Sequence, residues 1–245
     1  MGRTIVVGDI HGCALEFDDL LRAVSFSQSS DRLVLVGDLV ARGPDSAAVV
    51  EIARACGAWA VRGNHDEKVL SWWRHERAHG KRSADRKIKL SERHRAVAEA
   101  LTERQFGYLD ALPLMLSLPE HGLLVVHAGV DPSRPPVACD EETLLTARSV
   151  GDDGKISRKL GGVPWARLWR GPTQIVFGHD ARRNLQLEAF ATGLDTGCCY
   201  GRQLTSLVLD DGERVPADPQ ERARRLRWVP AREAWCPMGS GDGPE

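Results

Sequence analysis

Short apolar runs alternate with glycine-rich polar segments along the chain, and this alternation predicts the strands of a buried sheet. Each run is followed by a glycine or by a cluster of Asp, Asn and His residues. Buried strands of a parallel sheet are continuous apolar runs, and they bring their C-terminal ends to a common edge. The runs predicted to be strands are residues 4–7, 33–36, 59–61, 123–126 and 174–177.

Two amphipathic stretches separate the first three of these runs. They span residues 15–24 and 47–56, and their apolar residues recur at helical spacing. The second follows Gly43-Pro44-Asp45-Ser46, a typical start of a helix. A βαβαβ opening of this kind places the chain in the α/β class.

The middle and the C-terminal third have different patterns. Residues 67–112 are rich in helix formers, and the window 72–105 holds ten Lys or Arg against five Asp or Glu. This segment is either a helical cap inserted over a site or a set of solvated helix faces, and residues 140–170 are a second candidate cap. Alternating apolar and polar positions predict antiparallel strands, forming a second sheet, at residues 186–190, 204–209 and 227–230.

The composition is that of a folded globular protein and indicates no particular partner. The chain has 245 residues, 42% hydrophobic and 27% charged, with 33 basic residues against 34 acidic ones. These values exclude a disordered or collagenous chain, and the near-zero net charge does not indicate a nucleic-acid or membrane partner. No apolar run approaches the ~20 residues that span a bilayer, and no secretory signal precedes the first run. We expect one cytoplasmic domain over residues 1–245, with no obligate protein partner and a flexible tail at 239–245.

Six cysteines are scattered along the chain without a Cys-x-x-Cys pair. A chain of this length does not need disulfides to be stable. We predict that all six are small reduced residues of the core: Cys13, Cys56, Cys139, Cys198, Cys199 and Cys236.

Polar residues with metal-binding or catalytic side chains follow the predicted strands. His75, His79, His94 and His121 lie in polar stretches, where we expect exposed positions. The other four histidines each follow an apolar run, at the edge where open α/β sheets collect their functional groups. The residues at this edge are Asp9, His11, Asp38, Asn64, His65, His127 and His179.

This set of carboxylate, imidazole and amide groups fits two divalent ions better than a structural zinc site, because it contains no cysteine. Two ions need a shared ligand, and Asp38 is the natural bridge between the Asp9/His11 pair and the later residues. Two such ions activate a bridging hydroxide and stabilise an in-line displacement at phosphorus. The alternative, that these residues are only polar caps of strands, requires several independent coincidences.

The motifs around these residues resemble, in order and spacing, those of the calcineurin-like metallophosphoesterases. The motifs are Gly8-Asp9-Ile10-His11-Gly12, Gly37-Asp38-Leu39-Val40-Ala41-Arg42-Gly43, Gly63-Asn64-His65-Asp66, His127-Ala128-Gly129 and Gly178-His179. The resemblance implies a β-sandwich of two mixed sheets flanked by helices. Residues 38–46 and 194–201 are similar to the symmetrical bis(5'-nucleosyl)-tetraphosphatase branch, which lies next to the Ser/Thr phosphoprotein phosphatases.

The resemblance also implies the ligands of the two metals. Asp9, His11 and Asp38 would hold the first ion, and Asp38, Asn64, His127 and His179 would hold the second. Manganese is the expected metal, although iron, zinc, cobalt, nickel and magnesium suit such ligands as well.

Catalytic and substrate-binding roles follow from the same resemblance. His65 would be the general acid that protonates the leaving oxygen. Arg42 would hold phosphate oxygens and stabilise the charge of the transition state. Asn64 would also contact the substrate, and Tyr200 would stack on a base.

Position 41 departs from the pattern of the phosphoprotein phosphatases. Those enzymes usually have an aspartate that orients the catalytic histidine, whereas this chain has Ala41. Asp66 is our candidate substitute. The phosphoprotein phosphatases usually have glutamate at the position of Asp66, so both departures favour the nucleotide branch.

The function expected from the sequence is hydrolysis of a dinucleoside tetraphosphate, such as diadenosine tetraphosphate, to two nucleoside diphosphates. Nucleoside-tetraphosphate caps at RNA 5' ends contain a similar bond and are a second expected substrate. The first alternative is a Ser/Thr protein phosphatase acting on phosphoproteins. The second is a metal-binding module without catalysis, which the complete set of ligands with His65 and Arg42 argues against.

Overall fold

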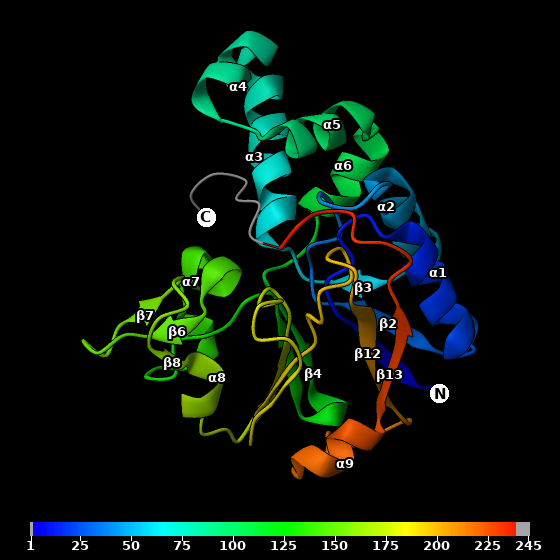
Figure 1. Cartoon of the computed structure of the whole chain (residues 1–245), viewed down its shortest axis with the longest axis vertical. Helices are drawn as coiled ribbons and strands as arrows, with labels where there is room; N and C mark the ends of the chain where they lie inside the picture. The colour runs from blue at the N-terminus through cyan, green and yellow to red at the C-terminus, as the bar shows by residue number, and fades with distance from the viewer. Residues whose placement is uncertain (1, 239–245) are drawn as a thin grey trace.

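The computed structural model describes residues 2–238 and confirms the α/β class (Figure 1). Within these residues, the strands form two five-stranded sheets and one three-stranded sheet. The first sheet has the order β13 (Leu226–Pro230), β12 (Gln203–Leu209), β1 (Thr4–Val7), β2 (Arg32–Leu35), β3 (Trp59–Ala60). The second has the order β10 (Gln186–Leu187), β11 (Ala191–Gly193), β9 (Gln174–Phe177), β5 (Leu123–Val126), β4 (Met115–Leu118). The predicted tail at 239–245 lies outside the described residues.

The two large sheets form the predicted sandwich because their central strands are apolar on both sides. In β1, Val6 belongs to the core between the sheets, whereas Ile5 and Val7 belong to the core under the helices. In β5, Val125 lies between the sheets and Val126 lies on the outer side. Successive side chains of a strand point to opposite faces, so a continuous apolar run needs cover on both faces.

Helices cover the outer faces of the sandwich. α1 (Ala14–Ala23) and α2 (Ser46–Ala55) pack on the first sheet. The predicted start of α2 is confirmed, since the Asp45 carboxylate accepts a hydrogen bond from the Ala48 amide at 2.8 Å. On the second sheet, Trp165 packs on Phe177 with ring centroids 4.8 Å apart. The remaining short helices are η1 (Pro119–His121), η2 (Pro136–Ala138), α7 (Glu141–Thr146), α8 (Trp165–Leu168) and α9 (Pro219–Arg224).

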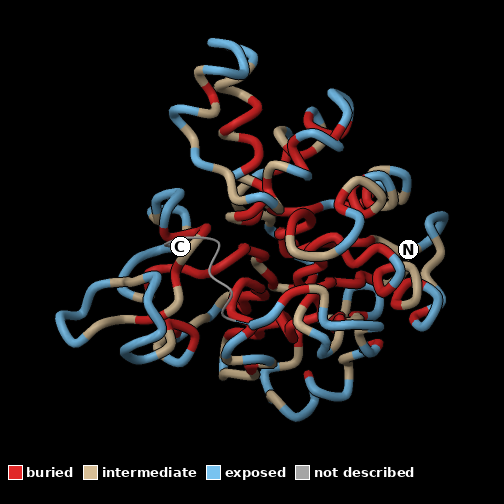
Figure 2. The backbone as a smooth tube through the Cα atoms, turned by 45° about the horizontal axis from the view of Figure 1, so that its top comes forward, coloured by how far each residue is buried: buried red, intermediate tan, exposed pale blue. Residues whose placement is uncertain are grey.

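A helical segment projects from the sandwich beside the C-terminal ends of the strands (Figure 1). It consists of α3 (Asn64–His79), α4 (Lys81–Lys87), α5 (Glu92–Ala100) and α6 (Glu103–Asp110). Its far end is exposed, whereas the base of α3 is buried (Figure 2). α6 returns to the body, where Gln105 Nε2 donates to the Ala47 carbonyl of α2 at 2.9 Å.

The prediction that the C-terminal strands form a sheet of their own is wrong. β12 pairs antiparallel with β1, with Val6 opposite Leu207, and β13 is the edge strand of the same sheet. The predicted strand 186–190 contains only β10, which joins the second sheet with β11. Local alternation predicts a strand but does not indicate the sheet to which an edge strand belongs.

The segment 140–170 contains a small sheet that its sequence did not indicate. β6 (Ser149–Val150) pairs antiparallel with β7 (Ile156–Ser157) and with β8 (Val163–Pro164). Strands of two residues are too short to show an alternating pattern.

The cysteine prediction is confirmed for four of the six residues. Within the described chain all six are free thiols, and the buried ones are Cys13, Cys198, Cys199 and Cys236. Cys56 and Cys139 are only half-buried. Across residues 2–238, no helix combines the length and the apolar character that a membrane crossing requires.

Candidate active site

The predicted site residues converge at the C-terminal ends of strands from both large sheets. Asp9 follows β1, Asp38 follows β2, and Asn64 and His65 begin α3, three residues after the end of β3. From the second sheet, His127 follows β5 and His179 follows β9. The sandwich therefore gathers groups that are up to 170 residues apart, as the hydrogen bonds from the His179 amide to the Asp9 carboxylate show.

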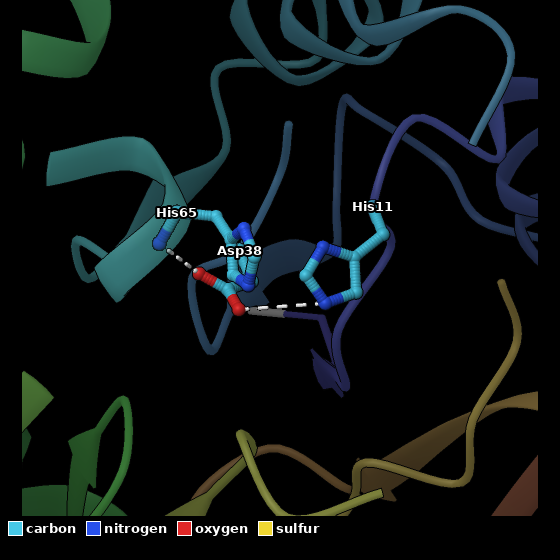
Figure 3. A group of neighbouring side chains, drawn as sticks. All are labelled: His11, Asp38 and His65. Atoms are coloured by element: carbon cyan, nitrogen blue, oxygen red, sulfur yellow. Dashed lines mark hydrogen bonds and ion pairs between the residues drawn. The ribbon is translucent and has the colours of Figure 1, made fainter. Parts of the chain in front are cut away.

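Asp38 lies at the centre of these groups. Its Oδ1 accepts a hydrogen bond from the His65 amide at 2.9 Å, and its Oδ2 faces His11 Nε2 at 3.4 Å (Figure 3). The same Oδ2 lies 3.5 Å from His127 Nε2. One carboxylate oxygen is thus placed between imidazoles that belong to different sheets.

The tautomers of His11 and His127 are fixed by backbone carbonyls. His11 Nδ1 lies 3.1 Å from the Val40 carbonyl, and His127 Nδ1 lies 2.9 Å from the Val36 carbonyl. A carbonyl only accepts, so each Nδ1 carries the proton and each Nε2 presents a lone pair. Both lone pairs face the oxygen of Asp38, an arrangement that a cation between them makes favourable.

Asn64 and His179 complete this side of the site. Asn64 Oδ1 lies 3.0 Å from His127 Nε2 and 2.9 Å from His179 Nδ1. His179 Nε2 is buried and has no hydrogen-bond partner among the described residues. The donor atoms of Asp38, His127 and His179 lie within 4.8 Å of one another, as do those of His11, Asp38 and His65.

The electrostatics of the site favour cations. Burial, followed by the charges of Asp195 and Asp38, raises the pKa of Asp9 well above its usual value. Burial is also the main cause that lowers the pKa of His127 to about 4 and lowers the pKa values of His11 and His179. Neutral imidazoles beside buried carboxylates, with the unpartnered His179 Nε2, are the donor set that divalent ions require.

The backbone of the site is unusually strained. Positive φ angles of non-glycine residues occur at His11 (49°), Asp38 (49°), Ala41 (69°), Arg42 (68°) and His179 (69°). Such conformations cost about 1–3 kcal/mol each and persist where the surrounding structure enforces them. Position 178 requires glycine, because a Cβ there would lie 1.8 Å from Asp9 Oδ1.

His65 is held at both ring nitrogens. Arg42 Nη2 and Nε lie 3.0 and 3.3 Å from His65 Nε2, and His94 Nε2 lies 2.8 Å from His65 Nδ1. Arginine only donates, so His65 Nε2 accepts and His65 Nδ1 donates to His94. His94 Nδ1 in turn lies 2.7 Å from Ser91 Oγ.

His94 corrects two sequence-based expectations. Its predicted exposure is wrong, since it is 4% exposed, and it contacts His65 where Asp66 had been the expected partner. The prediction of exposure is also wrong for His121, which is buried, whereas His79 is exposed and His75 is half-buried.

Asp66 shapes the loop that carries Asp38. Its Oδ1 accepts hydrogen bonds from the Leu39 and Val40 amides at 3.0 and 3.2 Å, and its Oδ2 accepts one from the Gly63 amide at 2.9 Å. Burial, followed by the charge of Asp38, raises the pKa of Asp66 to about 7. The structure therefore places Asp66 under the metal-site loops and not against the His65 ring.

Two arginines contact residues of the site. The guanidinium of Arg42 lies over the Tyr200 ring, with its Cζ 5.4 Å from the ring centroid. Arg148 Nη2 lies 3.4 Å from the His179 carbonyl, and after burial its charge is the next cause that lowers the pKa of His179. Arg148 belongs to no motif, so sequence reasoning had no signal for it.

The chain was compared with known families, curated proteins and solved structures. It is 39% identical to the symmetrical bis(5'-nucleosyl)-tetraphosphatase of Shewanella baltica (strain OS195), over 85% of this chain and 95% of that protein. For the enzyme of the same name from Erwinia tasmaniensis the identity is 30%, over 91% and 99% of the two chains.

Among solved structures, a crystal structure described as a candidate diadenosine tetraphosphatase has 38% identity and a TM-score of 0.78, covering 94% of each chain. A protein serine/threonine phosphatase from Saccharomyces cerevisiae has 17% identity and a TM-score of 0.55, covering 96% of this chain and 81% of that one, which shows the fold alone. Residues 2–194 match the family profile of the calcineurin-like phosphoesterases. The chain therefore belongs to the calcineurin-like phosphoesterase family, whose members are metallophosphoesterases.

Proposed function

We propose that this protein hydrolyses dinucleoside tetraphosphates, with diadenosine tetraphosphate giving two molecules of ADP. The observation that carries the proposal is the similarity to symmetrical tetraphosphatases over 85–91% of the chain. The site geometry supports phosphoester hydrolysis in general, and the likeness to the yeast protein phosphatase is confined to the fold.

We infer that Asp9, His11 and Asp38 hold one divalent ion, and that Asp38, Asn64, His127 and His179 hold the other. The geometry that supports this is the position of Asp38 Oδ2 within 3.5 Å of the Nε2 atoms of both His11 and His127. Manganese is the proposed metal, since Asp, His and Asn ligands suit it. Two bound divalent ions supply an activated water and neutralise charge at phosphorus.

In this proposal Arg42 binds the phosphate and thereby releases His65 Nε2, which takes up a proton from solvent. His65 keeps its Nδ1 proton on His94 and gives the Nε2 proton to the leaving oxygen. The hydrogen bonds of His65 to Arg42 and His94 orient its ring beside Asp38. A bound phosphate offers the Arg42 guanidinium a charged acceptor in place of His65 Nε2. Asp66 contributes by holding the Asp38 loop through its contacts with the backbone.

Groups beside the proposed metal ligands suit the nucleoside and the further phosphates of the substrate. A pocket of about 260 Å³ lies beside Arg42, between residues 41–47 and α5, and its lining includes Ala96, Val97 and Arg93. Apolar walls with a basic residue fit a nucleoside and its phosphate. We place one nucleoside of the substrate in this pocket, near the stacked Arg42–Tyr200 pair, and assign further phosphate binding to Arg148.

The test is a competition assay with manganese, in which one reaction contains diadenosine tetraphosphate and a phosphoserine peptide. ADP as the sole early nucleotide product, with the peptide intact, is the expected result. Faster dephosphorylation of the peptide, with the dinucleotide intact, would instead establish a protein phosphatase.

Two additions make this assay specific. A parallel reaction with RNA bearing a nucleoside-tetraphosphate cap tests the second proposed substrate, for which we expect release of a nucleoside diphosphate.

His65→Ala should lose most of the turnover of the dinucleotide. His79→Ala changes an exposed histidine on the same helix and should retain the turnover. An equal loss in both variants would contradict the role of His65.

A further inference from the structure

A second cluster of metal-binding side chains is separate from the proposed ligands of the active site. The donor atoms of Cys13, Glu16 and Cys198 lie within 4.8 Å of one another, and all three residues are at most 1% exposed. Cys13 is the N-cap residue of α1, and its side chain makes no capping hydrogen bond. Cys198 comes from the loop that follows β11, so residues distant in sequence form the cluster.

Glu16 is the unusual member of the cluster. Its Oε1 accepts hydrogen bonds from the Arg232 amide at 3.0 Å and from Trp235 Nε1 at 3.2 Å, whereas its buried Oε2 has no partner among the described residues. Arg232 does not neutralise it, because the Arg232 guanidinium pairs with Asp19. A fully buried carboxylate with an unpartnered oxygen is a favourable place for a cation.

We propose that Cys13, Glu16 and Cys198 bind a structural zinc ion, separate from the metals of the active site. Thiolate sulfur and carboxylate oxygen are common zinc ligands, at about 2.3 Å and about 2.0–2.2 Å. Such bonds hold tetrahedral donors roughly 3.5–3.8 Å apart, a spacing compatible with donor atoms that all lie within 4.8 Å of one another.

Cys236 is a further buried cysteine, outside the cluster of Cys13, Glu16 and Cys198. It is 1% exposed, and its amide donates to the Cys199 carbonyl at 3.1 Å, next to Cys198. Structural zinc sites have four protein ligands, and Cys236 would become the fourth by moving its thiol from Cys199, with which it is hydrogen-bonded in this structure, into the cluster.

This zinc would fasten three segments that support the catalytic groups. Cys13 follows His11 by two residues, Cys198 precedes Tyr200 by two residues, and Glu16 accepts a hydrogen bond from the Arg232 amide of the C-terminal segment. Thiolates select zinc over manganese or magnesium. The manganese that we assign to the active site would therefore not fill this second site.

The test uses cobalt(II) in place of zinc, on the reduced full-length protein. Cobalt bound to thiolates gives a charge-transfer band in the near ultraviolet, and the proposed ligands of the active site include no thiol. We expect the band to saturate at one cobalt per chain, to be displaced by zinc, and to be lost in Cys198→Ser. Cys56→Ser is the matched control, because Cys56 lies at the end of α2 outside the cluster, and it should keep the band.

A second, more conservative variant keeps the proposal testable if Cys198→Ser does not fold. Glu16→Gln removes the charge but keeps the shape, and it should weaken cobalt and zinc binding about tenfold or more while the band remains detectable. Metal analysis of the protein purified from zinc-supplemented medium should find one zinc more per chain in the wild type than in Cys198→Ser. Absence of the band in the reduced wild type, unchanged affinity in Glu16→Gln, or a Cys13–Cys198 disulfide found by peptide mapping would overturn the proposal.

Discussion

His65 is the residue whose environment the structure explains most fully. Arg42 can only donate, so the hydrogen bonds run in one direction, from Arg42 to His65, from His65 to His94, and from His94 to Ser91. This arrangement fixes the tautomer and the orientation of the His65 ring without an aspartate at position 41. His94 is therefore a positioning residue for the proposed general acid.

Replacement of His94 tests this positioning. His94→Ala should lower kcat for diadenosine tetraphosphate by about tenfold to a hundredfold, with little change in KM, because the His65 ring loses its orienting partner. His94→Gln offers an acceptor at a similar distance and should recover most of the rate. An aryl phosphate, whose leaving group needs no proton, should be hydrolysed by His94→Ala at nearly the wild-type rate.

The comparison of the two substrates separates positioning from a general structural defect. His79→Ala removes an exposed histidine of α3 and is the matched control for both assays. If His94→Ala lost both activities equally, or if glutamine were as inactive as alanine, His94 would only be part of the packing.

The motif residues of the site were predictable because each lies within a few residues of the end of a strand. Each motif consists of an apolar run and the polar residues that follow it, and both are visible in a short stretch of sequence. The order of residues therefore indicates that Asp9, Asp38, His127 and His179 share one edge. His94 was not predictable, since it lies 29 residues beyond His65 on a separate helix and has only polar neighbours in sequence. Tertiary packing of α5 against α3 creates that contact.

At the scale of the elements, the strands were predicted better than their pairing. Apolar runs indicate buried strands, and the sandwich of two mixed sheets is confirmed. The antiparallel pair of β1 and β12 joins residues about 200 positions apart, and no local pattern encodes such a partner. The two-residue strands of the small sheet are likewise set by their neighbours and not by alternation.

A capping box stabilises the start of α6, the helix that returns to the body. The Thr102 hydroxyl accepts from the Gln105 amide at 3.3 Å, and Gln105 Oε1 accepts from the Thr102 amide at 2.9 Å, a capping box. Thr102→Ala should therefore lower the free energy of unfolding by about 1 kcal/mol, and Thr102→Ser should lower it much less. Urea denaturation of the three proteins measures this difference, and equal stability of Ala and Ser variants would show that the cap contributes nothing.

Asp31 joins the beginnings of β1 and β2 and gives the fold a dependence on pH. It accepts hydrogen bonds from Arg3 Nη2 at 2.7 Å and from the Ser27 amide at 3.0 Å. Burial opposes ionisation, but these hydrogen bonds and the charge of Arg3 outweigh it, so the pKa of Asp31 is lowered. A group with a lowered pKa stabilises the fold above its unfolded value of about 3.9, and this contribution is lost as the pH falls through the folded value.

Asp31→Asn should accordingly lower the free energy of unfolding at pH 7 by about 1–2 kcal/mol, because a neutral amide is a weaker acceptor for Arg3. The difference from wild type should shrink below pH about 4, where the wild-type carboxylate is protonated in the unfolded chain. Urea unfolding at both pH values measures it, with the exposed Asp152→Asn as the control. A difference that stayed constant across this range would mean that the charge of Asp31 has no role.

At the scale of the whole molecule, the two sheets meet at a point that collects buried negative charge. Asp9 and Asp38 lie at the ends of neighbouring strands, and the charge of Asp195, two residues after β11, acts on Asp9 as well. Burial of like charges opposes folding unless cations neutralise them. The stability of the sandwich should therefore be linked to occupancy of the proposed binuclear site.

Manganese titration tests this linkage. At a free concentration a hundredfold above the Kd, binding to the folded state adds about 2.7 kcal/mol, which corresponds to a rise in Tm of about 5–10 °C for a chain of this size. Asp38→Asn removes one buried charge and the shared ligand together, so it should have a higher Tm than wild type without metal and a much smaller rise with manganese. Scanning calorimetry over a manganese series measures both effects. An identical rise in the two proteins would show that the stabilising ions bind elsewhere, and the assignment of Asp38 as the shared ligand would then be wrong.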